Sequence, residues 1–181
     1  EEARRVLDAL IQVPTQMRQV LARSEEIRFI AKKYMKARDM LFLGRGLGFP
    51  VALEGALKLK EISYIHAEGY SAGEMKHGPI ALVDEEMPVV VIIPNDNVFE
   101  KTLSNLKEVE SRNGRIIAVT DHRTKELEDV AWDIIDVPTT HRLLMPVLTV
   151  VPLQLLAYHV AVYRGTDVDQ PRNLAKSVTV E

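Results

Sequence analysis

Short, continuous apolar runs alternate along this chain with longer segments in which apolar residues recur every three or four positions. The runs are rich in Val, Ile and Leu, are bounded by polar residues, glycine or proline, and occupy residues 40–44, 88–94, 115–120 and 133–137. Continuous runs of this length are typical of strands that are buried on both faces. The alternation therefore predicts a three-layer αβα fold of the α/β class, with a parallel sheet of four to five strands and helices on both faces.

The helical segments differ in how clearly the sequence marks their ends. Residues 1–36 are expected to form an N-terminal helical connector that is broken near Val13 and Pro14, because proline disfavours a helical conformation in the residue before it. Later helices are expected at residues 50–64, 99–113, 124–130 and 141–164. Residues 66–79 are expected to be irregular, with a short strand at the start and one helical turn near residues 72–76.

Residues 143–163 are apolar and contain no Asp, Glu, Lys or Arg. This stretch is long enough to cross a bilayer. It nevertheless contains Pro146, Pro152, Gln154 and His159, and the predicted sheet needs an apolar helix to cover it. A helix buried in the core is therefore predicted, rather than a membrane span.

Active sites in parallel sheets lie at the carboxyl ends of the strands. The loops after Gly44, Pro94, Thr120 and Val137 are therefore expected to border a site. The first of these loops is rich in glycine and opens a helix, so its backbone could hold a phosphate. A dinucleotide fingerprint, however, requires glycine where this chain has Phe49. A tight turn between strand and helix is the favoured interpretation.

The composition restricts the classes of function. The 181 residues are 46% hydrophobic and 27% charged, which favours one soluble globular domain over residues 1–181. The net charge of −3 gives no electrostatic reason to expect nucleic acid or an anionic membrane as a partner. The lack of cysteine excludes disulfides, zinc–thiolate sites and cysteine nucleophiles, and it fits a reducing compartment. No residue spacing suggests a metal site. The chain starts without Met inside a helical pattern, so we expect it to be part of a longer protein.

Charged residues lie within the apolar face of the helix predicted at residues 50–64. Glu54, Lys58 and Glu61 follow i, i+4, i+7 spacing, which places them in one stripe along a helix. We call them the charged stripe. Its neighbours on the helical surface are Leu53, Leu57, Leu59, Ile62 and Tyr64. Charged groups enclosed by apolar walls would have perturbed proton affinities and could perform acid–base chemistry. The alternative is an ordinary helical ion pair, which contributes about 0.2–0.5 kcal/mol.

Two further residues are candidates on the basis of their chemistry. His77 lies in an irregular, glycine-flanked segment and could exchange protons near neutral pH. Lys176 lies near the end of a polar tail, and a buried lysine can form a Schiff base with a sugar carbonyl. Taken alone, either residue is more often a solvated surface side chain.

Several segments together resemble the family of bacterial glutamine–fructose-6-phosphate aminotransferases. They are LGRG at 43–46, ALEGALKLKEISYIHAE at 52–68, GEMKHGP at 73–79, PLQLLAYHVA at 152–161 and GTDVDQPRNLAKSVTVE at 165–181. The chain is similar to the second of the two sugar isomerase (SIS) subdomains that form the carboxyl-terminal half of those enzymes. The resemblance implies an SIS fold with residues 165–181 as a carboxyl-terminal active-site tail.

The resemblance also implies a reaction and roles for individual residues. Fructose 6-phosphate and glutamine-derived ammonia would give glucosamine 6-phosphate. Glu61 would move a proton between carbons 1 and 2 of the open-chain sugar, and Lys176 would form a Schiff base with the ketone. His77 would assist ring opening and, in the family, reaches the site of the neighbouring subunit in a homodimer. Lys58 and Glu54 would tune Glu61 and help to move protons. The backbone of Ala175 would contact the sugar.

The resemblance implies a cytoplasmic enzyme without a cofactor. It also implies that two parts of the family's enzyme are missing from this chain: a glutaminase domain, which begins with a nucleophilic cysteine, and the first SIS subdomain, which supplies the hydroxyl cluster that grips the phosphate. We therefore expect the isolated chain to bind sugar phosphate poorly and to have little activity. The alternative function is a non-catalytic SIS module that senses a sugar phosphate, which would need neither a base nor a Schiff-base lysine.

Overall fold

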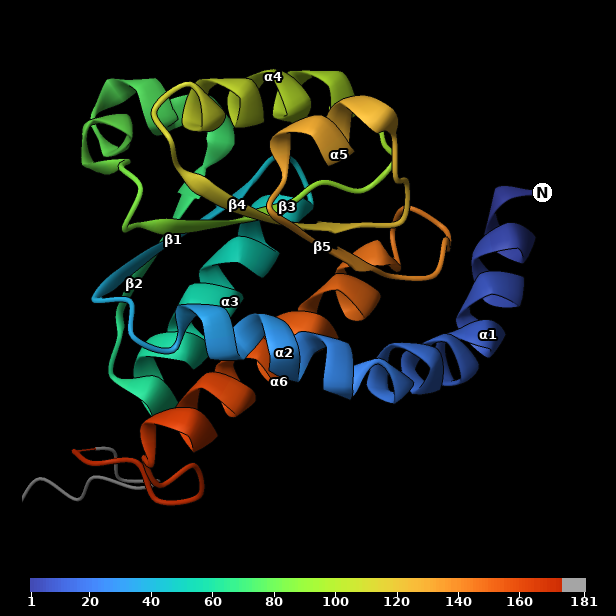
Figure 1. The fold of residues 1–181 in the computed structure, drawn as a ribbon. Coiled ribbons are helices and arrows are strands. Elements are labelled where there is room, and N and C mark those ends of the chain that lie inside the picture. The colour runs from blue at the N-terminus through green and yellow to red at the C-terminus, as the bar shows by residue number, and fades with distance from the viewer. Residues whose placement is uncertain (174–181) are drawn as a thin grey trace, which may run out of the picture.

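The computed structural model describes residues 1–173, which form a parallel five-stranded sheet with helices on both faces (Figure 1). The strand order is β2-β1-β3-β4-β5, and every neighbouring pair is parallel. The strands are β1 (Asp39–Gly44), β2 (His66–Ser71), β3 (Pro88–Ile92), β4 (Arg115–Thr120) and β5 (Asp133–Asp136). The predicted fold class is confirmed, and the short strand expected after residue 66 is the edge strand β2.

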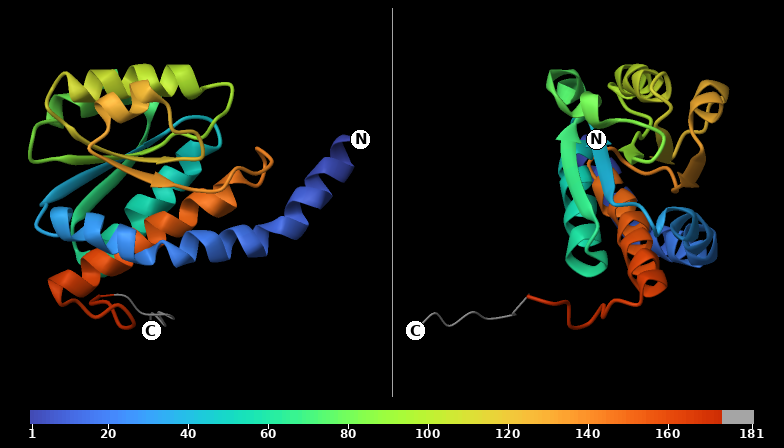
Figure 2. Two further views of the ribbon diagram at one scale, coloured as in Figure 1. Left: turned by 45° about the vertical axis from the view of Figure 1, so that its right-hand side comes forward. Right: turned by 60° about the vertical axis from the view of Figure 1, so that its left-hand side comes forward.

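The helices form two layers that cover opposite faces of the sheet (Figure 2). One layer contains α2 (Ser24–Tyr34), α3 (Gly48–Ser63) and α6 (Met145–Arg164), with α1 (Glu2–Ala22) packed along α6. The other contains the 3-10 helices η1 (Ala72–His77) and η2 (Pro79–Leu82), and the helices α4 (Phe99–Glu110) and α5 (Lys125–Val130). Side chains alternate between the layers along each strand, so that Phe42 faces α3 and α6 while Leu43 faces α4.

The predicted break near Val13 and Pro14 is wrong. Helix α1 continues through Pro14 to Ala22, and the chain breaks instead at Arg23 before α2 begins. Proline removes one helical hydrogen-bond donor but has a backbone angle compatible with a helix. Pro14 lies on the exposed side of α1, where water can satisfy the carbonyl that has lost its partner. Figure 1 shows α1 changing direction along its length, as expected for a proline-containing helix.

Helix α6 is long and apolar enough to cross a membrane by length and composition, but most of its apolar residues are buried against the rest of the chain. It packs against α1, α2 and α3, so the prediction of a core helix is confirmed. The helix starts at Met145, a few residues after the predicted start at 141.

A glycine sets the distance between α3 and its neighbours. A Cβ atom built on Gly55 would lie 2.7 Å from Cδ1 of Leu153 in α6 and 3.0 Å from the ring of Phe42 in β1. Only a residue without a side chain lets α3 approach both elements this closely. Gly55 therefore fixes the position of the helix that carries the charged stripe.

Candidate functional site

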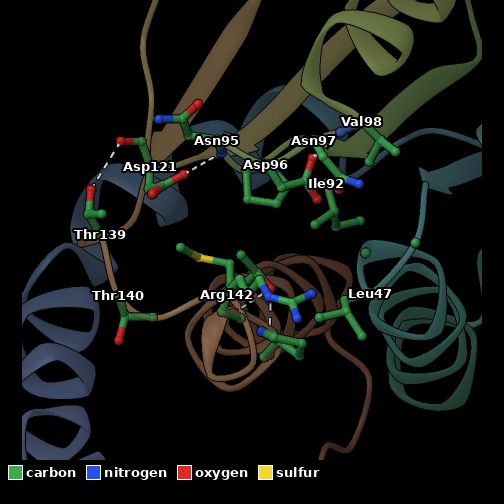
Figure 3. Close-up of a pocket in the computed structure, with 16 residues that line it drawn as sticks. Leu47, Ile92, Asn95, Asp96, Asn97, Val98, Asp121, Thr139, Thr140 and Arg142 are labelled. Atoms are coloured by element: carbon green, nitrogen blue, oxygen red, sulfur yellow. Dashed lines mark hydrogen bonds between the residues drawn. The ribbon is translucent and has the colours of Figure 1, made fainter. Parts of the chain in front are cut away.

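A pocket of about 320 Å³ opens at the carboxyl edge of the sheet (Figure 3). Its walls come from the four loops that follow β1, β3, β4 and β5, as the sequence predicts for a parallel sheet, and from the start of α6. The lining residues are Gly46, Leu47, Gly48, Ile92, Pro94, Asn95, Asp96, Asn97, Val98, Asp121, Thr139, Thr140, Arg142, Met145, Pro146 and Thr149.

The glycine-rich turn forms the pocket wall between β1 and α3. A Cβ on Gly44 would lie 2.3 Å from the carbonyl oxygen of Gly48, so the chain must reverse tightly here. The amides of Gly48 and Phe49 donate to the carbonyls of Arg45 and Gly46, at 2.8 and 3.3 Å. Because these two amides already have partners within the turn, they are not available to bind a phosphate. The structure favours the tight-turn interpretation.

Four of the eight polar side chains that line the pocket have structural partners. Asp121 accepts the backbone N–H of Asn95 at 2.7 Å, and Asp96 accepts that of Val98 at 2.9 Å. Arg142 is exposed, reaches over the pocket in Figure 3, and makes no side-chain hydrogen bond or ion pair within residues 1–173. The sequence predicted these loops but not the side chains that line the pocket. Their signal was a polar residue shortly after each predicted strand.

The charged stripe forms an ion-paired group on α3. Lys58 Nζ lies 2.6 Å from Glu61 Oε2 and 3.9 Å from Glu54 Oε1. The hydrogen bond to Glu61 raises the pKa of the Lys58 ammonium above its ordinary value, and the charge of Glu54 adds to this effect. The structure therefore brings together the residues that their spacing predicted to interact.

The predicted enclosure of the stripe by apolar walls is wrong for this chain. The exposed fractions of the side chains are 40% for Glu54, 33% for Lys58 and 28% for Glu61. Two of the expected wall residues, Leu53 and Leu57, are themselves 45% and 41% exposed. The opposite side of α3 packs into the core, and nothing within residues 1–173 covers the outward side. The charged stripe is thus half-buried on an open, partly apolar face.

The charged stripe is also distant from the pocket. Helix α3 begins at the pocket with Gly48 and runs to the amino edge of the sheet, so Glu61 lies about 20 Å further along the helix axis. None of Glu54, Lys58 and Glu61 lines the pocket. The rule that places sites at the carboxyl edge therefore describes the pocket but not the predicted catalytic base.

The start of the tail returns to the end of α3 that carries Glu61. Thr166 Oγ1 donates to the carbonyl of Ile62 at 2.6 Å. The backbone N–H of Arg172 donates to the Tyr64 hydroxyl at 2.9 Å, and the Arg172 guanidinium lies 4.2 Å from the centre of the Tyr64 ring. The other two predicted site residues, Ala175 and Lys176, lie outside the described residues.

His77 lies at the end of η1 with a 73% exposed side chain, and its Nδ1 is 2.8 Å from Glu74 Oε2. Glu61 precedes β2 and His77 follows it, so the two residues are at opposite ends of a strand about 20 Å long. They also belong to opposite layers, because η1 packs with α4 whereas α3 packs with α6. One chain therefore does not bring His77 and Glu61 together. Within residues 1–173, no group of three or more His, Cys, Asp or Glu side chains is arranged to hold a metal ion.

Comparison with known proteins identifies relatives over the whole chain. The chain is 58% identical to the glutamine–fructose-6-phosphate aminotransferase (isomerizing) of Chlorobaculum tepidum and 57% identical to one from Thermus thermophilus. Each alignment covers 100% of this chain and 30% of the relative. The chain thus spans about a third of the length of these curated relatives, and the resemblance seen in the sequence is confirmed.

Solved structures agree with this relationship. The C-terminal domain of glucosamine-fructose-6-phosphate aminotransferase from Francisella tularensis is similar with a TM-score of 0.83 and 45% identity, over 90% of this chain and 46% of that one. Tagatose-6-phosphate ketose/aldose isomerase from Escherichia coli shares the fold at a TM-score of 0.74 and 22% identity, over 85% of this chain and 43% of that one. The sequence model of the SIS domain matches residues 33–164. The chain therefore belongs to the SIS domain family.

Proposed function

We propose that this chain is the second SIS subdomain of an isomerising aminotransferase that makes glucosamine 6-phosphate from fructose 6-phosphate and glutamine-derived ammonia. The observation that carries the proposal is the charged stripe. An ammonium lies within hydrogen-bond distance of one carboxylate and close to a second, on a helix face with no partner within residues 1–173. The high identity to relatives with this activity supports the same assignment.

In this proposal, Glu61 is the base that moves a proton between carbons 1 and 2 of the open-chain sugar. A base must be ionised to accept a proton, and a carboxylate that is covered by a substrate loses water that stabilises its charge. Lys58 supplies a compensating positive charge at 2.6 Å, and Glu54 holds Lys58 from one turn away. The covered site would thus keep Glu61 ionised.

Lys176 would form the Schiff base, and the backbone of Ala175 would contact the sugar. The supporting observation is that the tail returns to the carboxyl end of α3 through Thr166 and Arg172. Lys176 follows Arg172 by four positions, which an extended chain spans in about 14 Å. An iminium at Lys176 would polarise the bond beside the carbon from which Glu61 removes a proton.

His77 would complete the site of a second subunit in a homodimer. Ring opening needs an acid or base near the ring oxygen, and His77 is exposed and far from Glu61 of its own chain. A site that contains both residues therefore requires His77 from a partner. The same enzyme would contain a first SIS subdomain and a glutaminase domain, and we propose a cytoplasmic location for it.

The first SIS subdomain would cover the open face of α3. Leu53 and Leu57 are exposed there beside the charged stripe, which is the composition of a surface that packs against another domain. That subdomain would also supply the phosphate-binding hydroxyls, because the turn after β1 has none and uses the amides of Gly48 and Phe49 internally. The isolated chain is therefore expected to bind fructose 6-phosphate weakly and to have little activity.

The test is the substitution Glu61→Gln in the full-length enzyme. Loss of the base should lower isomerisation by a factor of about 10²–10⁴ while calorimetry still shows sugar phosphate binding. The matched control is Glu25→Gln on α2, because Glu25 also forms an i,i+3 ion pair, with Arg28 at 2.8 Å, but lies away from the proposed site. Isomerisation that survives Glu61→Gln unchanged would eliminate the base role and favour a module that only senses a sugar phosphate.

A further inference from the structure

The η1 segment, which carries His77, is attached to α4 in two ways: through Arg45, which lies between them, and through a direct ion pair of Lys76. Arg45, from the turn after β1, donates through Nε to Asn105 Oδ1 of α4 at 3.1 Å. Lys76 Nζ of η1 lies 2.9 Å from Glu108 Oε1, one turn further along α4. We call Arg45, Lys76, Asn105 and Glu108 the α4 clamp. Figure 1 shows the green segment after β2 beside α4, where these contacts form.

Arg45 contacts η1 as well as α4. A Cβ atom built on Gly73 would lie 2.8 Å from Arg45 Nη2 and 3.2 Å from Cζ, so the guanidinium lies directly on the backbone of Gly73. Two nearby residues of η1, Ala72 and Met75, are fully buried in the core beneath α4. Arg45 therefore lies between η1 and α4 and touches both.

The position of His77 depends on this backbone. Its ring is exposed, and its side-chain partner within the described residues is Glu74, which belongs to the same short helix. Residues three apart in a 3-10 helix are aligned on one side, so Glu74 can orient the ring but cannot anchor it to the rest of the molecule. Contacts that fix η1 must supply that anchor.

We propose that Arg45 is a positioning residue for His77, acting through Gly73 and the α4 clamp. This inference rests on the proposed function, because it concerns the orientation of a group that would open the sugar ring in the partner subunit's site. Asn105 is almost fully buried, and its amide oxygen accepts from Arg45 Nε, so it loses this donor when Arg45 moves away. The cost of that unpaired oxygen favours the arrangement in which Arg45 stays on Gly73.

The most selective perturbation is Gly73→Ala in the full-length enzyme. Gly73 does not have a positive φ, so its backbone conformation accepts alanine. The added methyl group would meet only the end of a flexible arginine side chain, which can move aside while the fold is retained. A displacement of about 1 Å at a reacting group can cost about 10²-fold in rate. We expect kcat/KM for fructose 6-phosphate to fall by about 10–100-fold.

The substrate provides the readout that separates positioning from general damage. A ketose 6-phosphate without the hydroxyl that closes the ring needs no ring opening, so Gly73→Ala and Arg45→Met should leave its turnover near the wild-type rate. The substitution His77→Asn should likewise lower the turnover of the ring-closed substrate and leave the turnover of the open-chain ketose near the wild-type rate. The exposed Leu82→Ala on η2 is the control that should change neither substrate's turnover.

Double substitutions complete the test. If Gly73→Ala acts through Arg45, adding it to Arg45→Met should cause no further loss. If Arg45 acts through His77, adding Arg45→Met to His77→Asn should likewise cause none. The α4 clamp can be broken from either side, because Arg45→Met removes the donor and Asn105→Ala removes the acceptor of the same hydrogen bond. The test therefore does not depend on any one variant folding well.

The outcomes distinguish this inference from the proposed function. Full activity of His77→Asn on the ring-closed sugar would remove the proposed role of His77. A large loss in His77→Asn together with normal activity in Gly73→Ala and Arg45→Met would overturn only the positioning role. Losses that add up in the double variants, or that affect the open-chain analogue equally, would show that the clamp merely supports the fold.

Discussion

The packing of α3 leads to a prediction in which two effects of one substitution oppose each other. Replacing glycine by alanine within a helix normally stabilises a protein by about 0.8–1.0 kcal/mol, because alanine has the higher helix propensity. At Gly55, the new methyl group would lie 2.7 Å from Leu153 Cδ1 and 3.0 Å from the Phe42 ring, well inside van der Waals contact. Overpacking of a core by one methyl group costs about 1–3 kcal/mol. Gly55→Ala should therefore be destabilising, by up to about 2 kcal/mol.

Urea denaturation measured by circular dichroism would test this value. The informative control is the same substitution combined with Leu153→Ala, which removes the atom that the methyl group would approach most closely. In that background the penalty should shrink, so that Gly55→Ala becomes neutral or stabilising by about 1 kcal/mol. If Gly55→Ala stabilises the otherwise unchanged chain by about 1 kcal/mol, α3 is not packed against α6 and β1 as closely as described.

Three further predictions concern single contacts. Burial lowers the pKa of His159, which hydrogen-bonds Ser24 at 2.8 Å, so the unfolded chain takes up a proton at higher pH than the folded one. Stability should therefore fall as the pH decreases through about 6.5. The substitution His159→Gln should flatten the dependence of the melting temperature on pH between about pH 5 and 7, and an unchanged slope would contradict this cause. Tyr34→Phe should cost about 1.5–3 kcal/mol in a denaturant titration, because the buried Tyr34 hydroxyl donates to Asp133 at 2.7 Å. Thr124→Ala should cost about 1 kcal/mol in the same assay, since Thr124 caps α5 through the N–H of Leu127, whereas Thr124→Ser should be nearly neutral.

The local elements were predictable because each is encoded within a short segment. Continuous apolar runs marked four strands, and the helix predicted at residues 99–113 forms α4, which ends three residues earlier at Glu110. The charged stripe was likewise predictable, because spacing along one helix determines which side chains meet. The break in the N-terminal helices was not, because its place depends on whether the environment of Pro14 tolerates a missing hydrogen bond.

The candidate site was only partly predictable. The sequence predicted that Lys58 would contact Glu61 and that strand-end loops would border a pocket, and the structure confirms both. It also predicted a buried stripe, which is wrong because burial depends on what packs against a helix face. The roles of His77 and Lys176 remain predictions. The separation of His77 from Glu61 follows from the position of β2 between them, which the sequence pattern marked only weakly.

The sequence by itself determined the order of strands and helices, the family resemblance and the spacing of the charged residues, because periodicity and side-chain chemistry act over a few neighbouring positions. Only the tertiary structure decided the order of strands in the sheet, the open face of α3, the contact of Arg45 with Gly73 and the distance from the pocket to the charged stripe. These features arise from contacts between residues far apart in the chain, and a local pattern carries no information about which distant surface will cover it.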